Sequence, residues 1–365
     1  MSYLLSIVVP TKNRYKYLKV LIKLIDSFKS NEIELIIHDN SDNNFEIIDY
    51  INSFNNNNIK YFHSNEKLTM ISNSDLAISK STAEYVCFIG DDDGVTRNIL
   101  DCVKWMKSNN VDSIFSNCAY YNWSGTAQFF KRKNNIIKHD TSIELNVLLR
   151  KGMILNESHL PLLYHAIVKR EVLNTIYKKY ETHFLSTPPD ISSAVLLAFE
   201  VNKYYEINIP IIINGTSEMT GGGVIRKGGV IRLDDVDFIN DNDRKEWENF
   251  IPPIWCGSYA WANSGIKTLQ KNGKESYINK FDIDYNLAHA FSLRPKKIVL
   301  FIYALKYKKS LIRLFYYIFL LLTKRLLRKF ISKLNKNIII QRNLHSIIEA
   351  EEFFYLNSIN SQNLN

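Results

Sequence analysis

An apolar run that ends in three carboxylates constrains the fold more than any other stretch of this sequence. Residues 84–95 read EYVCFIGDDDGV, so strand-forming residues 85–89 are followed by Gly90 and then by Asp91, Asp92 and Asp93. Such a run is typical of a buried strand in a parallel sheet. The carboxyl ends of the strands form the ligand crevice in open α/β sheets. Alternate carboxylates there favour a Mg²⁺ or Mn²⁺ site that bridges to a substrate diphosphate, over the plain turn that Asp and Gly also suit.

The preceding residues repeat a strand–loop–helix order. Strand-like runs at 4–9, 33–38 and 59–63 alternate with helical spacing at 15–28 and 68–79, which predicts βαβ units and a parallel sheet. The G-x-G-x-x-G and G-x-x-x-x-G-K-[ST] fingerprints are absent from the sequence. Asp39 follows the second run. It suits either a contact with a base or ribose, or an Asx turn that needs no ligand.

Three motifs in this order, IVVPTKNR, IIHDNSD and EYVCFIGDDDG, resemble the donor-nucleotide half of a family 2 glycosyltransferase of the GT-A fold. The resemblance covers roughly the first 120 residues. It implies an α/β, Rossmann-like mixed sheet flanked by helices, a nucleotide-diphosphate sugar as donor, and Mn²⁺ or Mg²⁺ as cofactor. It also implies a base contact from Asp39, a metal–diphosphate site at Asp91 and Asp93, and Asp92 near the ribose. The remaining nucleotide contacts it implies are Pro10, Thr11, Asn13, Arg14 and Asn73.

A second informative stretch, STPPDISSAVLLAF at 186–199, places two prolines before Asp190 and an apolar helix after it. Asp190 is therefore expected at or near a helix N-cap, where it would stay ionised. Inverting glycosyl transfer needs a carboxylate to take the proton of the acceptor hydroxyl. Family members place an acid before a helix at this distance, and we assign Asp190 as the general base.

A glycine-rich stretch, residues 214–230, carries Arg226 and Lys227. It suits equally a plain flexible loop and a lid whose cations compensate a diphosphate. His159 and His165 are each more typical of a satisfied core or loop histidine than of a metal ligand. The Q-x-x-R-W motif of processive family members is missing, which points to transfer of a single sugar.

The positive charge is concentrated in one segment. Residues 285–348 hold 14 Lys and Arg and no acid, which leaves a net charge of −5 for the rest of a chain whose total is +9. On one continuous helix, the cations Lys306, Lys309, Arg313, Lys324 and Arg328 would share a face of about 100°. The longest uncharged run there is ten residues, too short to span a bilayer. The apolar content argues against a nucleic-acid face and favours the anionic surface of a membrane, although a helix packed on the domain is the plainer alternative.

These observations predict four segments. Residues 1–232 form a GT-A domain, with a donor half at 1–120 and an acceptor half at 121–232. A helical extension at 233–293, basic amphipathic membrane-associating helices at 294–348 and a frayed tail at 349–365 follow. The four unpaired cysteines suggest reduced thiols in a cytosolic compartment, and the first ten residues lack the features of a signal peptide.

The expected activity is metal-dependent, inverting transfer of one sugar to a polyprenyl-diphosphate-linked saccharide, in bacterial O-antigen or capsule synthesis. The enzyme is expected to lie peripherally on the cytoplasmic face of the inner membrane. Two alternatives stay open: a nucleotidyltransferase on a similar fold, and a non-catalytic membrane-bound nucleotide-sugar sensor, which would have no need of a base at Asp190.

Overall fold

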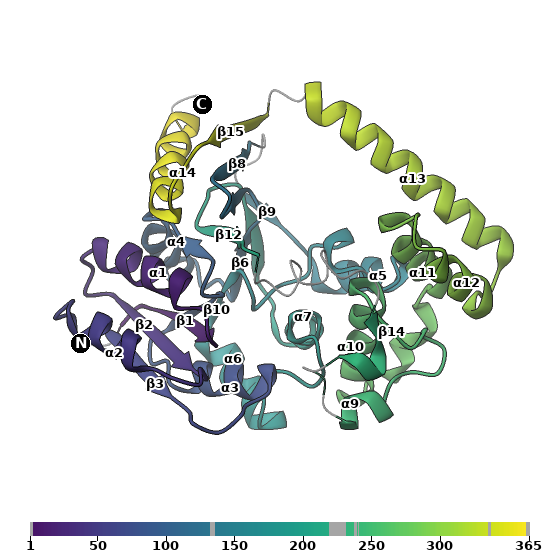
Figure 1. Cartoon of the computed structure of the whole chain (residues 1–365), viewed down its shortest axis with the longest axis horizontal. Helices are drawn as coiled ribbons and strands as arrows, with labels where there is room; N and C mark the ends of the chain where they lie inside the picture. Colours follow the sequence, from purple (N-terminus) through teal and green to yellow (C-terminus); the bar gives the residue numbers. More distant parts are fainter. Residues whose placement is uncertain are drawn as a thin grey trace.

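The computed structural model, which describes residues 3–131, 136–218, 231–236, 239, 241–334 and 337–362, is built on an eight-stranded mixed sheet (Figure 1). The strand order is β3-β2-β1-β4-β10-β6-β11-β9. The first four strands in this order are parallel, and β10 runs antiparallel to both of its neighbours. The mixed sheet confirms the expected fold class. Its strands are β1 (Leu5–Thr11), β2 (Ile33–Asp39), β3 (Ile59–His63), β4 (Tyr85–Phe88), β6 (Ser113–Ser116), β9 (Ile136–Lys138), β10 (Ala166–Lys169) and β11 (Tyr204–Ile207).

Helices cover both faces of this sheet because successive strand side chains point to opposite faces. In β1, Ile7 and Val9 pack in one buried cluster with three helices, α1 (Tyr15–Ser27), α2 (Phe45–Asn52) and α4 (Asn98–Ser108). Val8 packs on the other side with helices α3 (Met70–Ser79), α6 (Arg170–Tyr180) and α7 (Pro189–Glu200). Strands that are buried on both faces need apolar residues at every position, which explains why the strands of this sheet read as continuous apolar runs in the sequence.

A second sheet, ordered β15-β8-β7-β12-β5, shares two stretches of the chain with the main sheet. Residues 112–121 divide between β6 and β7, and residues 204–213 divide between β11 and β12. Pro210, which has no N–H to donate, lies at the second break. The strands of this sheet are β5 (Gly94–Val95), β7 (Ala119–Asn122), β8 (Thr126–Phe130), β12 (Ile212–Thr216) and β15 (Ile338–Arg342).

The C-terminal segment returns to the N-terminal half of the chain instead of fraying. In place of the expected tail, α14 (Ile347–Gln362) packs Ile347, Ala350 and Phe354 into a buried cluster with the second sheet. Glu351, whose side chain is 2% exposed, accepts hydrogen bonds from Arg97 at both carboxylate oxygens, 2.6 and 3.0 Å long. The polar composition of the last residues is why the sequence did not predict that one face of this helix is buried.

The remaining helices form a lobe that shares one core with α7. The lobe contains α5 (Thr141–Arg150), α10 (Gly257–Lys271), α11 (Ile283–Leu293), α12 (Ile298–Tyr307) and α13 (Leu311–Leu334). Beside them lie the short helix α9 (Asp241–Lys245), the strand pair β13 (Ile231–Arg232) and β14 (Ile254–Trp255), and 3-10 turns at Leu155–Glu157, Leu233–Asp235 and Glu275–Lys280. Helix α13 extends across the top of the molecule toward β15 (Figure 1).

The single cationic helix face expected at 306–328 does not form. The chain breaks between α12 and α13, where the buried Asp284 carboxylate accepts the backbone N–H groups of Lys309 and Ser310. Arg313 pairs with Asp282, and Arg325 donates to the Ser292 carbonyl. Several of the cations therefore bind the protein itself. Among the described helices, none combines the length and the apolar character that a membrane crossing requires.

Candidate active site

The three adjacent aspartates lie at the carboxyl end of β4, and their side chains are almost fully buried. Asp91, Asp92 and Asp93 are each 1–2% exposed, although they lie side by side in the sequence. Buried carboxylates are costly unless they are paired and hydrogen-bonded. The groups that compensate them come from four separate parts of the chain, and this convergence defines the candidate site.

Asp93 is the most completely bonded of the three. Its Oδ2 accepts the Tyr164 hydroxyl at 2.8 Å and the Gly90 N–H at 2.7 Å, and lies 2.7 Å from His165 Nε2. Its Oδ1 accepts the Gly215 N–H at 2.7 Å. Burial alone would raise the pKa of Asp93, but the charge and hydrogen bond of His165 and the two backbone donors hold it below its usual value. Asp93 is therefore an ionised anchor for this loop.

Asp91 and Asp92 share one arginine. Arg14 places Nε 3.1 Å from Asp91 Oδ1 and a terminal nitrogen 2.8 Å from Asp92 Oδ2, and Thr11 donates to Asp91 Oδ2 at 2.6 Å. Burial raises the pKa of Asp91 to about 7 against the opposing effects of Arg14 and Thr11. Burial and the charge of Asp93 raise the pKa of Asp92. Asp91 Oδ1 is buried and lies in an ion pair with Arg14, but it accepts no hydrogen bond of good geometry from the described residues.

The second sheet presses directly against this loop. A Cβ on Gly215 of β12 would lie 1.7 Å from the Asp92 carbonyl oxygen, so no other residue fits there. The next residues continue the contact, since the Ser217 N–H donates to Asp92 Oδ2 and the Ser217 hydroxyl accepts from Arg14. Trp123 donates its indole N–H to the Asp92 carbonyl. The small sheet thus fixes the backbone of the carboxylate loop.

Asp39 and its neighbours organise the loop after β1. Asp39 is fully buried, and its Oδ2 accepts the hydroxyls of Tyr15 and Tyr61 at 2.6 and 2.7 Å. Its Oδ1 accepts the Ser41 N–H, which is the Asx turn that the sequence left open. Burial raises the pKa of Tyr15 to about 12, so this hydroxyl remains a donor to Asp39. A nucleotide base would reach Asp39 only after one tyrosine moved.

Asn73 and Asn13 hold the same loop from two sides. Asn73 donates to the Thr11 carbonyl at 3.2 Å, and its Oδ1 lies 2.6 Å from His38 Nδ1. Asn13 exchanges hydrogen bonds with Asp42 and has a positive φ of 56°, a conformation that asparagine tolerates better than most residues. Both predicted residues therefore support the loop.

A cavity of about 560 Å³ lies beside Asp91. Three cations, Lys12, Arg14 and Lys67, border it together with Asp91, so the space combines positive charge with one carboxylate. Of the predicted nucleotide residues, Pro10, Thr11, Arg14, Asn73 and Asp91 line this cavity, whereas Asn13, Asp39 and Asp92 lie outside its lining. The other lining residues are Asn40, Leu68, Thr69, Met70, Ser74 and Ile239.

Asp190 lies in the first turn of α7, one residue inside the helix start. Its Oδ1 accepts the Ile191 N–H at 2.9 Å, and its Oδ2 accepts the indole N–H of Trp261 at 3.0 Å. Burial raises its pKa, and these two donors and the charge of His165 only partly oppose that rise. Asp190 thus lies near the helix N-cap, as expected, and is a more basic carboxylate than an exposed aspartate. The charge of His165 therefore acts on both carboxylates, Asp190 and Asp93.

Sequence reasoning missed several of these residues. Tyr164 and His165 directly precede β10, which runs antiparallel to β4, so they come to the carboxyl end of β4. Knowledge of that strand direction would have identified them. Trp261 lies on α10, in the extension that carried no assigned role. Arg226 and Lys227, the expected lid cations, lie outside the described residues.

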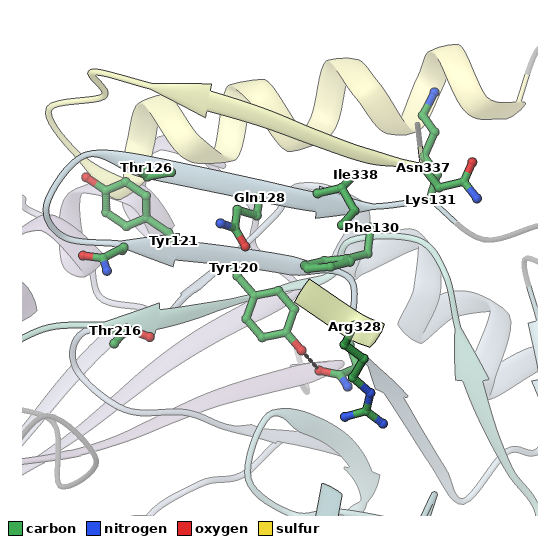
Figure 2. Close-up of a pocket in the computed structure, with 12 residues that line it drawn as sticks. Tyr120, Tyr121, Thr126, Gln128, Phe130, Lys131, Thr216, Arg328, Asn337 and Ile338 are labelled. Carbon is green, nitrogen blue, oxygen red and sulfur yellow. Dashed lines mark hydrogen bonds between the residues drawn. The ribbon is translucent and has the colours of Figure 1, made fainter. Parts of the chain in front are cut away.

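A second cavity, of about 930 Å³, opens between the second sheet and α13 (Figure 2). Tyr120, Gln128 and Phe130 project into it from β7 and β8, and Arg328 approaches from α13. Tyr120 donates a hydrogen bond to Asn117, and its ring meets Phe130 edge to face at 5.4 Å. Thr216 also lines this cavity, between Gly215 and Ser217, which bind the carboxylate loop.

Comparisons with known proteins agree with this geometry. Residues 6–176 match the family described as Glycosyl transferase family 2. The chain is 25% identical over 184 residues to Glycosyltransferase GlyG of Streptococcus pneumoniae, a match that covers 48% of this chain and 60% of the relative. It is 28% identical over 117 residues to a GalNAc(5)-diNAcBac-PP-undecaprenol beta-1,3-glucosyltransferase of Campylobacter jejuni, covering 31% of this chain and 38% of the relative. The matches thus span less than two thirds of either relative.

Among solved structures, S. aureus TarS 1–349 in complex with UDP-GlcNAc superimposes with a TM-score of 0.52 at 14% identity, over 82% of this chain and 79% of the TarS 1–349 chain. At this identity the likeness concerns the fold. Residues 6–176 therefore resemble family 2 glycosyltransferases, and the chain has the GT-A fold.

Proposed function

We propose that this protein transfers a single sugar from a nucleotide-diphosphate donor to a lipid-linked saccharide, with inversion at the anomeric carbon. The observation that carries the proposal is the 560 Å³ cavity, where Lys12, Arg14 and Lys67 lie beside Asp91. Cations of this kind suit the charge of a diphosphate. The Campylobacter relative is named for glucosyl transfer to an undecaprenol-linked saccharide, which supports an acceptor of the same class.

The residues fit a divalent ion at one carboxylate better than at two. Asp91 Oδ1 is paired with Arg14 but accepts no hydrogen bond of good geometry from the described part of the chain, so a hard cation such as Mn²⁺ or Mg²⁺ would take the place of Arg14 at this oxygen. Four donors already occupy the oxygens of Asp93. We therefore assign Asp91 as the metal ligand and Asp93 as the anchor of its loop. When bound, the ion would neutralise charge that develops on the leaving diphosphate.

Asp190 supplies the base. The acceptor hydroxyl gives its proton to an Asp190 oxygen as the hydroxyl oxygen attacks the anomeric carbon, and the nucleoside diphosphate leaves with the bonding electrons. Trp261 orients the carboxylate through its indole N–H. The raised pKa of Asp190 makes it a stronger base than an ordinary carboxylate.

The second cavity suits the saccharide part of the acceptor. Its aromatic faces, Tyr120 and Phe130, pack well on sugar rings, and Gln128 and Asn117 offer both donors and acceptors to hydroxyls. Thr216 connects this cavity to the segment that fixes the carboxylate loop. We therefore assign the larger cavity to the acceptor and the smaller one to the donor.

The lipid part of the acceptor suits the exposed side of α12 and α13. Apolar side chains there are unusually exposed: Ile298, Ile302, Ile312, Phe315, Phe319, Leu326 and Leu327. Lysines interrupt this surface, as in helices that lie on anionic membranes. Arg328, on the same helix α13, borders the larger cavity, so one helix would serve both the lipid and its saccharide. We therefore propose that the protein lies peripherally on the cytoplasmic face of the inner membrane.

Thermal shifts with nucleoside diphosphates, measured with and without Mn²⁺, test the donor site. We expect one nucleoside diphosphate to raise Tm strongly in Mn²⁺ and much less in EDTA, and the Asp91→Asn variant to lose the difference. An equal shift in EDTA would remove the metal from the proposal. A product that keeps the donor's anomeric configuration would contradict inversion, and release of pyrophosphate would favour nucleotidyl transfer. Donor binding that is followed by no transfer to any acceptor would favour the sensor.

A further inference from the structure

Two histidines and a glutamate meet at the far edge of the main sheet, away from the carboxylate loop. Glu206 lies on β11, His139 directly follows the edge strand β9, and His159 lies in the loop after the 3-10 turn at Leu155–Glu157. Their candidate ligand atoms all lie within 4.8 Å of one another. Nothing in the transfer reaction proposed above uses these three side chains.

Both imidazoles face the same carboxylate oxygen. His139 Nε2 lies 3.3 Å and His159 Nδ1 lies 3.1 Å from Glu206 Oε2. Donor atoms around a tetrahedral zinc ion, each about 2.0–2.2 Å from the metal, stand roughly 3.3 Å apart. The two nitrogen–oxygen distances are therefore already close to those of a tetrahedral site, and all three candidate atoms lie within 4.8 Å.

A second carboxylate orients the cluster from outside. Glu144 Oε1 lies 3.5 Å from His139 Nδ1, the ring nitrogen that faces away from Glu206, and Glu144 Oε2 accepts the His159 backbone N–H at 2.7 Å. Histidine ligands of metals usually direct their second nitrogen to such a carboxylate. The Glu206 side chain is only 4% exposed, which keeps its oxygen fixed in place.

We propose that His139, His159 and Glu206 bind one Zn²⁺ ion, with a water molecule in the fourth position. Two imidazoles and one carboxylate are a donor set that zinc favours, and magnesium and calcium do not. The two rings stack at 4.9 Å with 9° between their planes, so one ring must turn for both nitrogens to point at a single ion. The His159 side chain is 47% exposed and has room for that turn.

The ion would join three segments that lie apart in the sequence. It ties β9 and β11 to the loop that runs from His159 toward Tyr164 and His165, which bind Asp93. The zinc site would thus stabilise the loop that holds the carboxylate anchor, without touching the substrates.

The test is zinc titration of the full chain by calorimetry after dialysis against a chelator, together with the visible spectrum of Co²⁺ in place of zinc. The Asp91→Asn variant is used throughout, so that an ion at the donor site is not counted. We expect one equivalent of Zn²⁺, a tetrahedral Co²⁺ spectrum and a higher Tm. In this background, His139→Gln and Glu206→Gln should abolish all three results, and Glu144→Gln should weaken zinc binding about 10–100-fold.

His159→Gln is the decisive variant because its exposed ring can be replaced without disturbing the core. The matched control is His345→Gln, an exposed histidine far along the chain, which should bind zinc as the parent does. If the parent binds no zinc, or if His159→Gln binds it with unchanged affinity, the three residues are an ionic cluster of imidazoles around a carboxylate, and the proposal is wrong.

Discussion

The carboxyl edge of the main sheet and the helix pair α12–α13 depart from the ordinary burial pattern in opposite directions. At the sheet edge, three adjacent carboxylates are at most 2% exposed. On the helices, Ile312 is 84% exposed and Phe319 is 68% exposed. A buried charge needs hydrogen-bond or ion-pair partners and so fixes the residues around it, whereas a cluster of exposed apolar side chains is typical of a surface that binds a partner or a membrane. The chemistry of the first region can therefore be read from its contacts within the protein, and that of the second region only from binding experiments.

Asp93→Ala probes the buried side of the comparison and should have the largest effect. Its removal leaves His165, Tyr164 and two backbone N–H groups without their acceptor. We expect a loss of about 3–5 kcal/mol in the free energy of unfolding, as for other broken buried pairs. Urea denaturation of this variant and of Asp91→Ala measures the difference.

The smaller number of contacts to Asp91 predicts that Asp91→Ala unfolds at a clearly higher urea concentration than Asp93→Ala, while losing the Mn²⁺-dependent thermal shift. Relief of repulsion among three like charges would give the opposite order, with Asp93→Ala as stable as the parent. That result would return Asp93 to the set of candidate metal ligands.

Asp190→Asn separates chemistry from donor binding. The amide keeps the shape of the side chain but cannot take a proton, so turnover should fall by a factor on the order of 10² or more. Nucleotide-dependent thermal shifts should match those of the parent, because the donor cavity lies elsewhere. Unchanged turnover would remove Asp190 from the role of base.

Phe319→Asp probes the exposed side of the comparison. Charge on the outer face of α13 should release the protein from vesicles of anionic lipid in a co-sedimentation assay, because it cancels apolar insertion and repels the surface. The matched control is Phe45→Asp on α2, where an equally isolated phenylalanine is 74% exposed and should leave binding unchanged. Retention of both variants on the vesicles would place the membrane contact elsewhere.

Trp261→Phe tests, through the pH dependence of kcat/KM, how a buried carboxylate depends on its hydrogen-bond donors. The variant removes a donor to the ionised carboxylate of Asp190, so the already raised pKa should rise further. A base acts only when deprotonated, and the acidic limb of kcat/KM should therefore move to higher pH, by about one unit. Trp247→Phe is the control, since its indole bonds only to the Ile251 and Pro252 carbonyls among the described residues. A limb that stays in place would show that Trp261 does not orient the base.

The donor half could be predicted well from the sequence because its signals are local. Each strand of the parallel unit is one apolar run, and the loop residues Thr11, Arg14 and Asp91 directly follow such runs. Their convergence follows from strand direction alone. The alternating order of strands and helices was enough to predict the parallel unit, whereas the mixed sheet was predicted from the family resemblance.

The rest depended on contacts between distant residues. Tyr164, His165 and Gly215 reach Asp93 across more than 70 positions, and Trp261 reaches Asp190 across 71. No periodicity in the sequence encodes such pairs. The break between α12 and α13 was missed for the same reason, because Asp284, which binds the N–H groups there, lies 25 residues upstream. The polar character of α14 likewise concealed Glu351, whose partner is Arg97.

The return of the chain from α13 to β15 has a consequence for how the proposed membrane-bound enzyme would work. Helix α13 is held at its start by the core it shares with α11, and the strand that follows it is paired with β8. An anchor on a single flexible linker would let a catalytic domain tumble above the bilayer. An anchor held at both ends would instead fix the domain, because a helix of 24 residues, roughly 36 Å long and lying in the plane of the surface, would hold it in one orientation and at one height. Acceptors whose reactive hydroxyl lies at that height would be selected by length as well as by chemistry.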